Sequence, residues 1–173
     1  ISLKAGTSST TGTGGSLQLH SGASAMGAGG DILVATPVSG ASGGIALQSG
    51  SATSAASGEI RIASGDSMAG PAGSISLAVG VTSTGARGGN IVAVAGAHDG
   101  DGDGGDLRFS SGAAGGRGAS GNLVLHSAPG TKAGSSGKIE LATGESSRAT
   151  GGLRIASGAS SLSGSGDVEV ASG

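Results

Sequence analysis

The residues best able to do chemistry in this chain lie in one acidic stretch, HDGDGDGGD at residues 98–106. Its alternating carboxylates are the oxygen ligands that Ca²⁺ prefers, but Ca²⁺ takes six to eight oxygens, usually shared between successive turns. The neighbouring stretches, VTSTGARG and AAGGRGAS, supply no carboxylate. We therefore predict a solvated corner at residues 98–106 and no metal site.

The other reactive side chains are scattered. His20 and His126 fall at equivalent positions of distant repeats and His98 falls on a different arm, so we interpret all three as surface histidines. No Ser stands in a nucleophile elbow beside a His and Asp set. Strings similar to GxGxxG are followed by no helix, and GGRG at 115–118 is a lone basic turn. We predict no catalytic, cofactor-binding or metal-binding residues, no cofactor and no enzyme activity.

Composition removes several further classes of protein. The 173 residues include 40 Gly, one Phe and no Cys, Trp or Tyr, and 12% are charged. Glycine does not fall at every third position, which excludes collagen. With a net charge of −2, the chain offers no basic patch to nucleic acid. The sequence also lacks the 18-residue apolar run that would predict membrane insertion.

The whole chain is built from a sequence repeat, and this repeat must position any functional residue. Aliphatic residues recur in pairs two residues apart, at twelve places spaced by 13 to 16 residues. The first of each pair is Ile1, Leu17, Ile32, Ile45, Ile60, Ile75, Ile91, Leu107, Leu123, Ile139, Leu153 and Val168. The second is Leu3, Leu19, Val34, Leu47, Ile62, Leu77, Ala93, Phe109, Leu125, Leu141, Ile155 and Val170. A third column, two residues on, is mostly Ala, Ser or Thr. Spacing of two places these residues on one face of an extended chain.

The glycines divide each repeat into an aliphatic segment and a second arm. Each internal repeat opens with Gly two residues before its first aliphatic residue, as at Gly15, and most segments close on Gly, as at Gly22. We expect these corner glycines to supply positive φ and close backbone approach. The arm between them is rich in Ser, Ala and Gly, often with Ser at its second position, and we expect it to be a thin, strand-like layer packed on the aliphatic one.

A fixed short period with alternating apolar residues predicts an all-β fold, a parallel β-solenoid of about twelve 13–16-residue repeats. We favour one flattened coil per repeat over two repeats per coil. The expected core is a stack of aliphatic columns at the usual ~4.8 Å spacing. Phe109 follows Ala93 in its column, as size matching between stacked neighbours predicts.

Two sets of outward-facing residues bear on assembly. Glu140, Arg154 and Glu169 alternate in sign along successive repeats, which predicts favourable neighbours in a stacked ladder. Leu33, Val92, Val94 and Val124 are more apolar than an isolated solenoid needs, and they favour lateral packing.

The repeat unit SGxIxLxSGxS resembles the Gly/Ser/Ala-rich repeat proteins of algae and stramenopiles and the repeats expected in flagellar hairs (mastigonemes). Bacterial adhesin and autotransporter solenoids have a similar look, and residues 98–106 are similar to the calcium-binding turns of RTX repeats. The resemblance covers the whole chain and implies an extracellular fibrous role without carrying over any functional residue.

The sequence thus predicts a structural protein that forms the shaft of an extracellular filament or surface hair. The partners expected are other copies, end to end and laterally, with Ser and Thr as candidate positions for glycans. An adhesin stalk and an ice-binding solenoid are the alternatives, although the Thr residues fall in different columns. Because the repeat runs from Ile1 to Gly173, we expect one repeat domain over 1–173 that is a segment of a longer array.

Overall fold

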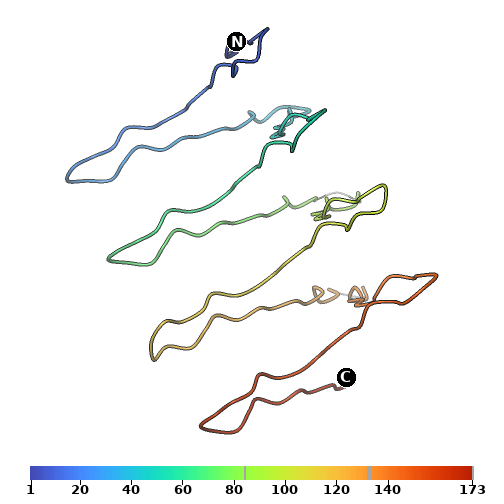
Figure 1. Cartoon of the computed structure of the whole chain (residues 1–173). Helices are drawn as coiled ribbons and strands as arrows, with labels where there is room; N and C mark the ends of the chain where they lie inside the picture. Colours follow the sequence, from blue (N-terminus) through green and yellow to red (C-terminus); the bar gives the residue numbers. More distant parts are fainter. Residues whose placement is uncertain (84, 132–133, 173) are drawn as a thin grey trace. The chain divides into compact units, whose positions relative to one another are not determined.

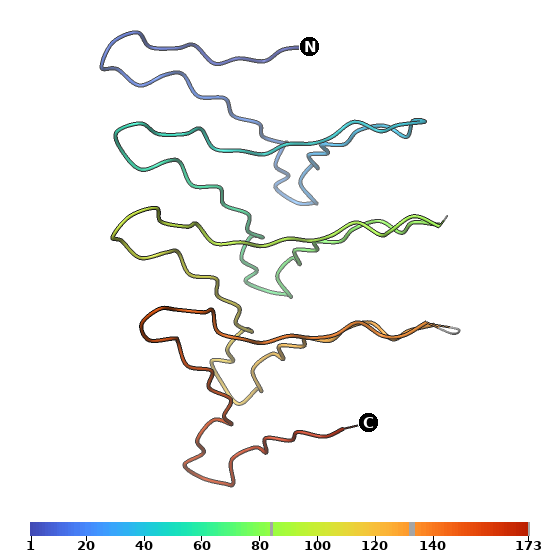
Figure 2. The same cartoon turned by 90° about the vertical axis from the view of Figure 1, so that its right-hand side faces the viewer.

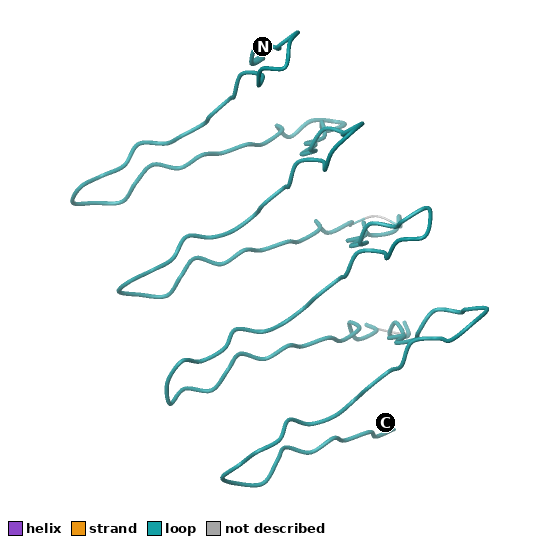
Figure 3. Cartoon of the chain, viewed as in Figure 1, coloured by secondary structure: helices purple, strands orange, loops and turns teal. Residues whose placement is uncertain are grey.

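A computed structural model describes residues 1–83, 85–131 and 134–172, and over these residues it contains neither helix nor strand (Figure 3). The prediction of an all-β, parallel β-solenoid is therefore wrong, and so is the stacked ladder that went with it. Strands require a partner backbone along their length. The backbone hydrogen bonds recorded for the described residues fall within or at the base of the arms, and none joins two aliphatic segments.

The chain instead alternates straight aliphatic segments with bent arms. Each described arm tip contains a bend, for example at 25–27, 53–55 and 161–163, whereas the aliphatic segments run without one. Figures 1 and 2 show the same pattern, in which long stretches of tube are separated by tight turns. The arms are thus direction-reversing loops, which corrects the expectation of a strand-like layer packed on the aliphatic segments.

Glycine backbones close the base of several arms, and we call this base the neck. The amide of Gly15 donates to the carbonyl of Gly6 at 2.8 Å, and Gly30 donates likewise to Gly22 at 2.9 Å. The same bond recurs at Gly105–Gly96 and Gly121–Gly112, each at 2.9 Å. The closing glycine of one repeat and the opening glycine of the next therefore hold the two ends of the arm together.

Close approach explains why the opening residue is Gly at two of the arms, those that end at Gly15 and Gly89. A methyl group placed at Gly15 would lie 3.1 Å from the amide nitrogen of Gly6 and 3.4 Å from the Ala5 side chain. At Gly89 it would lie 2.8 Å from Val79. Ala5 and Val79 belong to the third column of the repeat, so that column lies against the next opening glycine. No described glycine adopts positive φ, so the corner glycines provide space and not a left-handed turn.

The necks join only the bases of the arms, and the rest of the chain is exposed to solvent. No residue in the described part is buried, and the accessible surface is 17081 Å². A compact protein of 15.6 kDa would expose only about 7,200 Å², and its unfolded chain about 22,600 Å². The expected dry core of aliphatic columns is absent from the described residues, and Phe109, assigned to that core, is 66% exposed.

The chain divides into two units by its backbone contacts, Ile1–Gly89 and Asn90–Gly173. The boundary coincides with the opening glycine of the seventh repeat, so each unit contains six repeats. The glycine-to-glycine bonds close the first two arms of each unit. Gly173, at which the repeat ends in the sequence, lies outside the described residues.

We predict that Gly15→Ala opens the first neck. The added methyl group would meet the Gly6 backbone, which cannot rotate away as a side chain can. Loss of a hydrogen bond with a net value of about 0.5–1.5 kcal/mol should speed exchange of the residue 15 amide roughly two- to tenfold. Hydrogen exchange followed by NMR measures this. Gly44→Ala is the matched control, because a methyl group there would meet nothing within 4 Å. Equal exchange rates in the wild type and both variants would show that the neck does not depend on close approach.

Candidate interaction surface

The feature of the structure that can engage a partner is its repeated aliphatic surface. From Leu17 onward, the first aliphatic residue of each repeat is 52–63% exposed and the second, where it is larger than Ala, is 64–91% exposed. In each internal repeat where both residues are larger than Ala, the first is the less exposed of the two. Leu33, Val92, Val94 and Val124, predicted to face outward, are also exposed. The apolar side chains on both sides of the segments are thus open to solvent.

Serine hydroxyls shape the arms that separate these segments. Ser24 Oγ accepts the amide of Gly27 at 2.9 Å, and Ser67 Oγ accepts that of Gly70 at 3.1 Å. Ser160 Oγ accepts the amide of Ser163 at 3.1 Å in the same way. A hydroxyl that bonds the backbone a few residues ahead favours a turn over an extended chain. The small residue at the second arm position was recognised in the sequence, but its role in bending the arm was not.

These three serine turns each present a large apolar side chain. Met26, Met68 and Leu162 lie inside the turns and are fully exposed. They belong to the second, fifth and eleventh arms of the chain, and the eighth arm carries Arg117 in their place. The spacing of three repeats between such arms was not predicted from the sequence.

The polar side of some segments carries ion pairs between residues two apart. Arg108 pairs with Asp106, and Lys138 pairs with Glu140. Both pairs are exposed, so each contributes only about 0–1 kcal/mol to stability. They show that the side chains flanking the first aliphatic residue lie on one side of the segment. Glu140 was expected to neighbour Arg154 in a ladder, and the structure pairs it with Lys138 instead.

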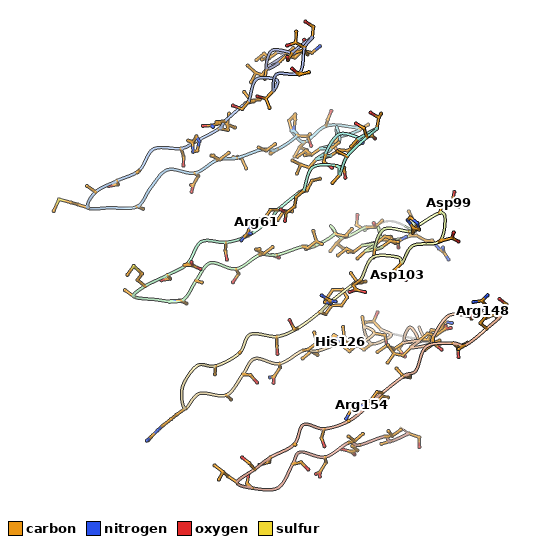
Figure 4. The ribbon with its side chains drawn as sticks, in the orientation of Figure 1. Arg61, Asp99, Asp103, His126, Arg148 and Arg154 are labelled. Carbon is orange, nitrogen blue, oxygen red and sulfur yellow. The ribbon has the colours of Figure 1, made fainter. Side chains whose placement is uncertain are left out.

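The residues first considered for chemistry are exposed and dispersed. Asp99 and Asp103 lie on the arm that bends at 99–102 (Figure 4). The His98 imidazole lies over the backbone of this arm, where a methyl group at Gly102 would be 2.7 Å from Nε2. His126 is on an aliphatic segment, away from this arm (Figure 4). Among the described residues, no three His, Cys, Asp or Glu side chains gather closely enough to hold a metal ion.

The described residues contain neither a cavity nor a membrane-spanning helix that would indicate a site other than the aliphatic surface. No pocket is present in the part of the chain that the structure describes. Within the same residues, no helix has the length and apolar character needed to cross a membrane. The surface available for recognition is therefore the exposed aliphatic segments and the apolar turns between them.

Comparison with known proteins adds no relative. No family model matches the sequence, and searches of curated proteins and of solved structures find no match. The functional argument accordingly starts from the residues of this chain.

We predict that Ser67→Ala loosens the turn around Met68. Alanine cannot accept the Gly70 amide, so that amide should become solvated, with its NMR temperature coefficient moving to the value typical of an exposed amide. Ser74→Ala is the control, because Ser74 lies in the next straight segment. Ser67→Asn should restore protection, since an Asn side chain makes the same kind of turn. An unchanged Gly70 amide in Ser67→Ala would contradict the role assigned to the hydroxyl.

Proposed function

We propose that this chain is a structural protein that builds an extracellular fibre or surface hair by association of many copies. The observation that carries the proposal is the aliphatic pair of each repeat, which is at least half exposed in every internal repeat where both residues are larger than Ala. Apolar area removed from water contributes about 25 cal/mol per Å². A chain that leaves its regularly spaced aliphatic residues uncovered gains stability when another surface covers them.

The amount of uncovered surface supports association over many contacts. The accessible area exceeds that of a compact protein of this mass by about 10,000 Å². A standard protein interface buries about 1,200–2,000 Å² in total. One small docking contact would leave most of the excess area exposed, whereas assembly along the whole repeat would cover it.

The repeat itself favours copies of the same chain as partners. Its aliphatic pairs recur at 13 to 16 residues, and a second copy offers the same sequence of intervals. Low charge, 12% of residues with a net value of −2, imposes little repulsion between copies. The resemblance of the repeat to those of flagellar hairs and adhesins supports an extracellular location, with Ser and Thr side chains available to glycans.

Ice binding is the less favoured function. It needs a flat, regular array of Thr, and the Thr residues of this chain lie in different columns of the repeat. The described residues also contain no strand that would arrange them in a flat sheet. A stalk that displays an adhesive domain shares the structural role proposed here.

Sedimentation of the chain at micromolar concentration, combined with electron microscopy, tests the proposal. We expect concentration-dependent growth into fibres. Substituting Ile62, Phe109 and Leu141 together with Asp should raise the concentration needed for assembly at least about tenfold, because each change places a carboxylate on the aliphatic surface that must become dry.

The control adds the same charge to arm tips. Thr53→Asp, Ala114→Asp and Ser161→Asp lie in or directly beside arm bends and not in aliphatic segments, so this variant should assemble nearly as the wild type does. A wild-type chain that stays monomeric throughout would overturn the proposal. Equal loss in both variants would show that net charge controls assembly and that the aliphatic surface does not.

A further inference from the structure

We propose that copies of the chain associate edge to edge through equivalent segments laid antiparallel, with each contact centred on Ile60, Leu107 or Ile139. This inference rests on the proposed function, because it specifies how the copies meet. It is drawn from the residues flanking each of these three side chains, which have opposite charges one position before and one position after. In the pairs Asp106–Arg108 and Lys138–Glu140 the structure brings both flanking side chains to the same side of the segment.

The order of charges determines which orientation is favourable. When two identical segments lie antiparallel about Leu107, Asp106 of each copy faces Arg108 of the other. When they lie parallel and in register, Asp106 faces Asp106 and Arg108 faces Arg108. Opposite charges on facing positions are stabilising and like charges are destabilising. Antiparallel pairing therefore gives two attractive contacts where parallel pairing gives two repulsive ones.

The same rule applies at the other two centres. Glu59 and Arg61 flank Ile60, and Lys138 and Glu140 flank Ile139. The charge order is reversed around Ile139, but a segment paired with its own copy remains complementary in the antiparallel orientation. A two-fold axis through the central residue makes every such contact occur twice.

The sizes of the residues fit this alignment as well. Antiparallel pairing about Leu107 places Phe109 opposite Gly105 of the other copy. About Ile60 it places Ile62 opposite Gly58, and about Ile139 it places Leu141 opposite Gly137. The largest side chain thus meets the residue with no side chain, which keeps the facing surfaces in close contact. Parallel pairing in register would set Phe109 against Phe109 and glycine against glycine.

One segment does not share this charge pattern. Asp167 and Glu169 flank Val168 with two negative charges, which repel in either orientation. Exposed aliphatic residues elsewhere, such as Leu33 and Val124, add apolar contact without preference for orientation. The three oppositely charged centres therefore select the orientation.

A charge-swapped variant tests this without changing net charge. It carries Glu59→Arg, Arg61→Glu, Asp106→Arg, Arg108→Asp, Lys138→Glu and Glu140→Lys. Antiparallel pairing remains complementary between two swapped chains, as it is between two wild-type chains. Between a wild-type and a swapped chain, antiparallel pairing places like charges opposite each other.

The measurement is energy transfer between chains labelled at the α-amino group with donor or acceptor dyes. At low salt, wild-type mixtures and swapped mixtures should both show transfer, and mixed assembly should be weaker by at least about tenfold over the six facing positions. Raising the salt concentration should reduce the preference, because these charges are exposed.

Each other outcome overturns the inference in a recognisable way. Stronger mixing of wild-type with swapped chains than of either with itself would assign parallel pairing. Equal transfer in all mixtures at low salt would show that these charges do not orient the copies, while fibre formation and the proposed function would stand. Absence of assembly in every mixture would remove the proposed function together with this inference.

Discussion

Contact between glycine backbones at the neck is the one backbone interaction that recurs among the described residues, where it closes four arms. A methyl group added at Gly15 would lie 3.1 Å from the Gly6 amide nitrogen and 3.4 Å from the Ala5 side chain, so a larger residue would displace these atoms. One backbone hydrogen bond then holds the ends of the arm at 2.8 Å. The opening glycine lies two residues before the first aliphatic side chain, which is the less exposed of the pair. The exposed apolar groups therefore recur with the same spacing as the opening glycines.

The necks also explain why the chain holds local order without a core. Each neck joins residues about nine apart, so little entropy is lost in closing the arm. A serine hydroxyl adds a second local bond in arm 22–30, and another supplies a local bond in arm 65–73, where no neck bond is recorded. These contacts repeat along the chain, but none brings one aliphatic segment against another. Local order and missing burial therefore have the same origin, since every recorded backbone bond spans a short stretch of sequence.

The sequence predicted the parts of the structure that depend on local pattern. The sequence predicted close backbone approach at the corner glycines, which is present at Gly15, but it also assigned these glycines positive φ, which the described ones do not adopt. The prediction of a β-solenoid was wrong because it needed more than the local pattern. Apolar residues two apart, such as Ile60 and Ile62, share one face of the segment, but this spacing does not show what covers that face. A ladder is a long-range property, and this repeat is compatible with cover from another copy.

Charge and glycine together explain how a repetitive chain can still choose a partner geometry. Identical aliphatic pairs would accept a neighbour in many registers and in both directions, which leads to irregular aggregates. A few flanking pairs of opposite sign, such as Asp106 with Arg108, penalise the parallel arrangement of equivalent segments. Glycine at the opening position then matters twice, since Gly105 closes the neck with Gly96 and leaves space opposite Phe109 of a second copy. In a chain with so few charges, their positions carry the information about orientation and the aliphatic residues carry the affinity.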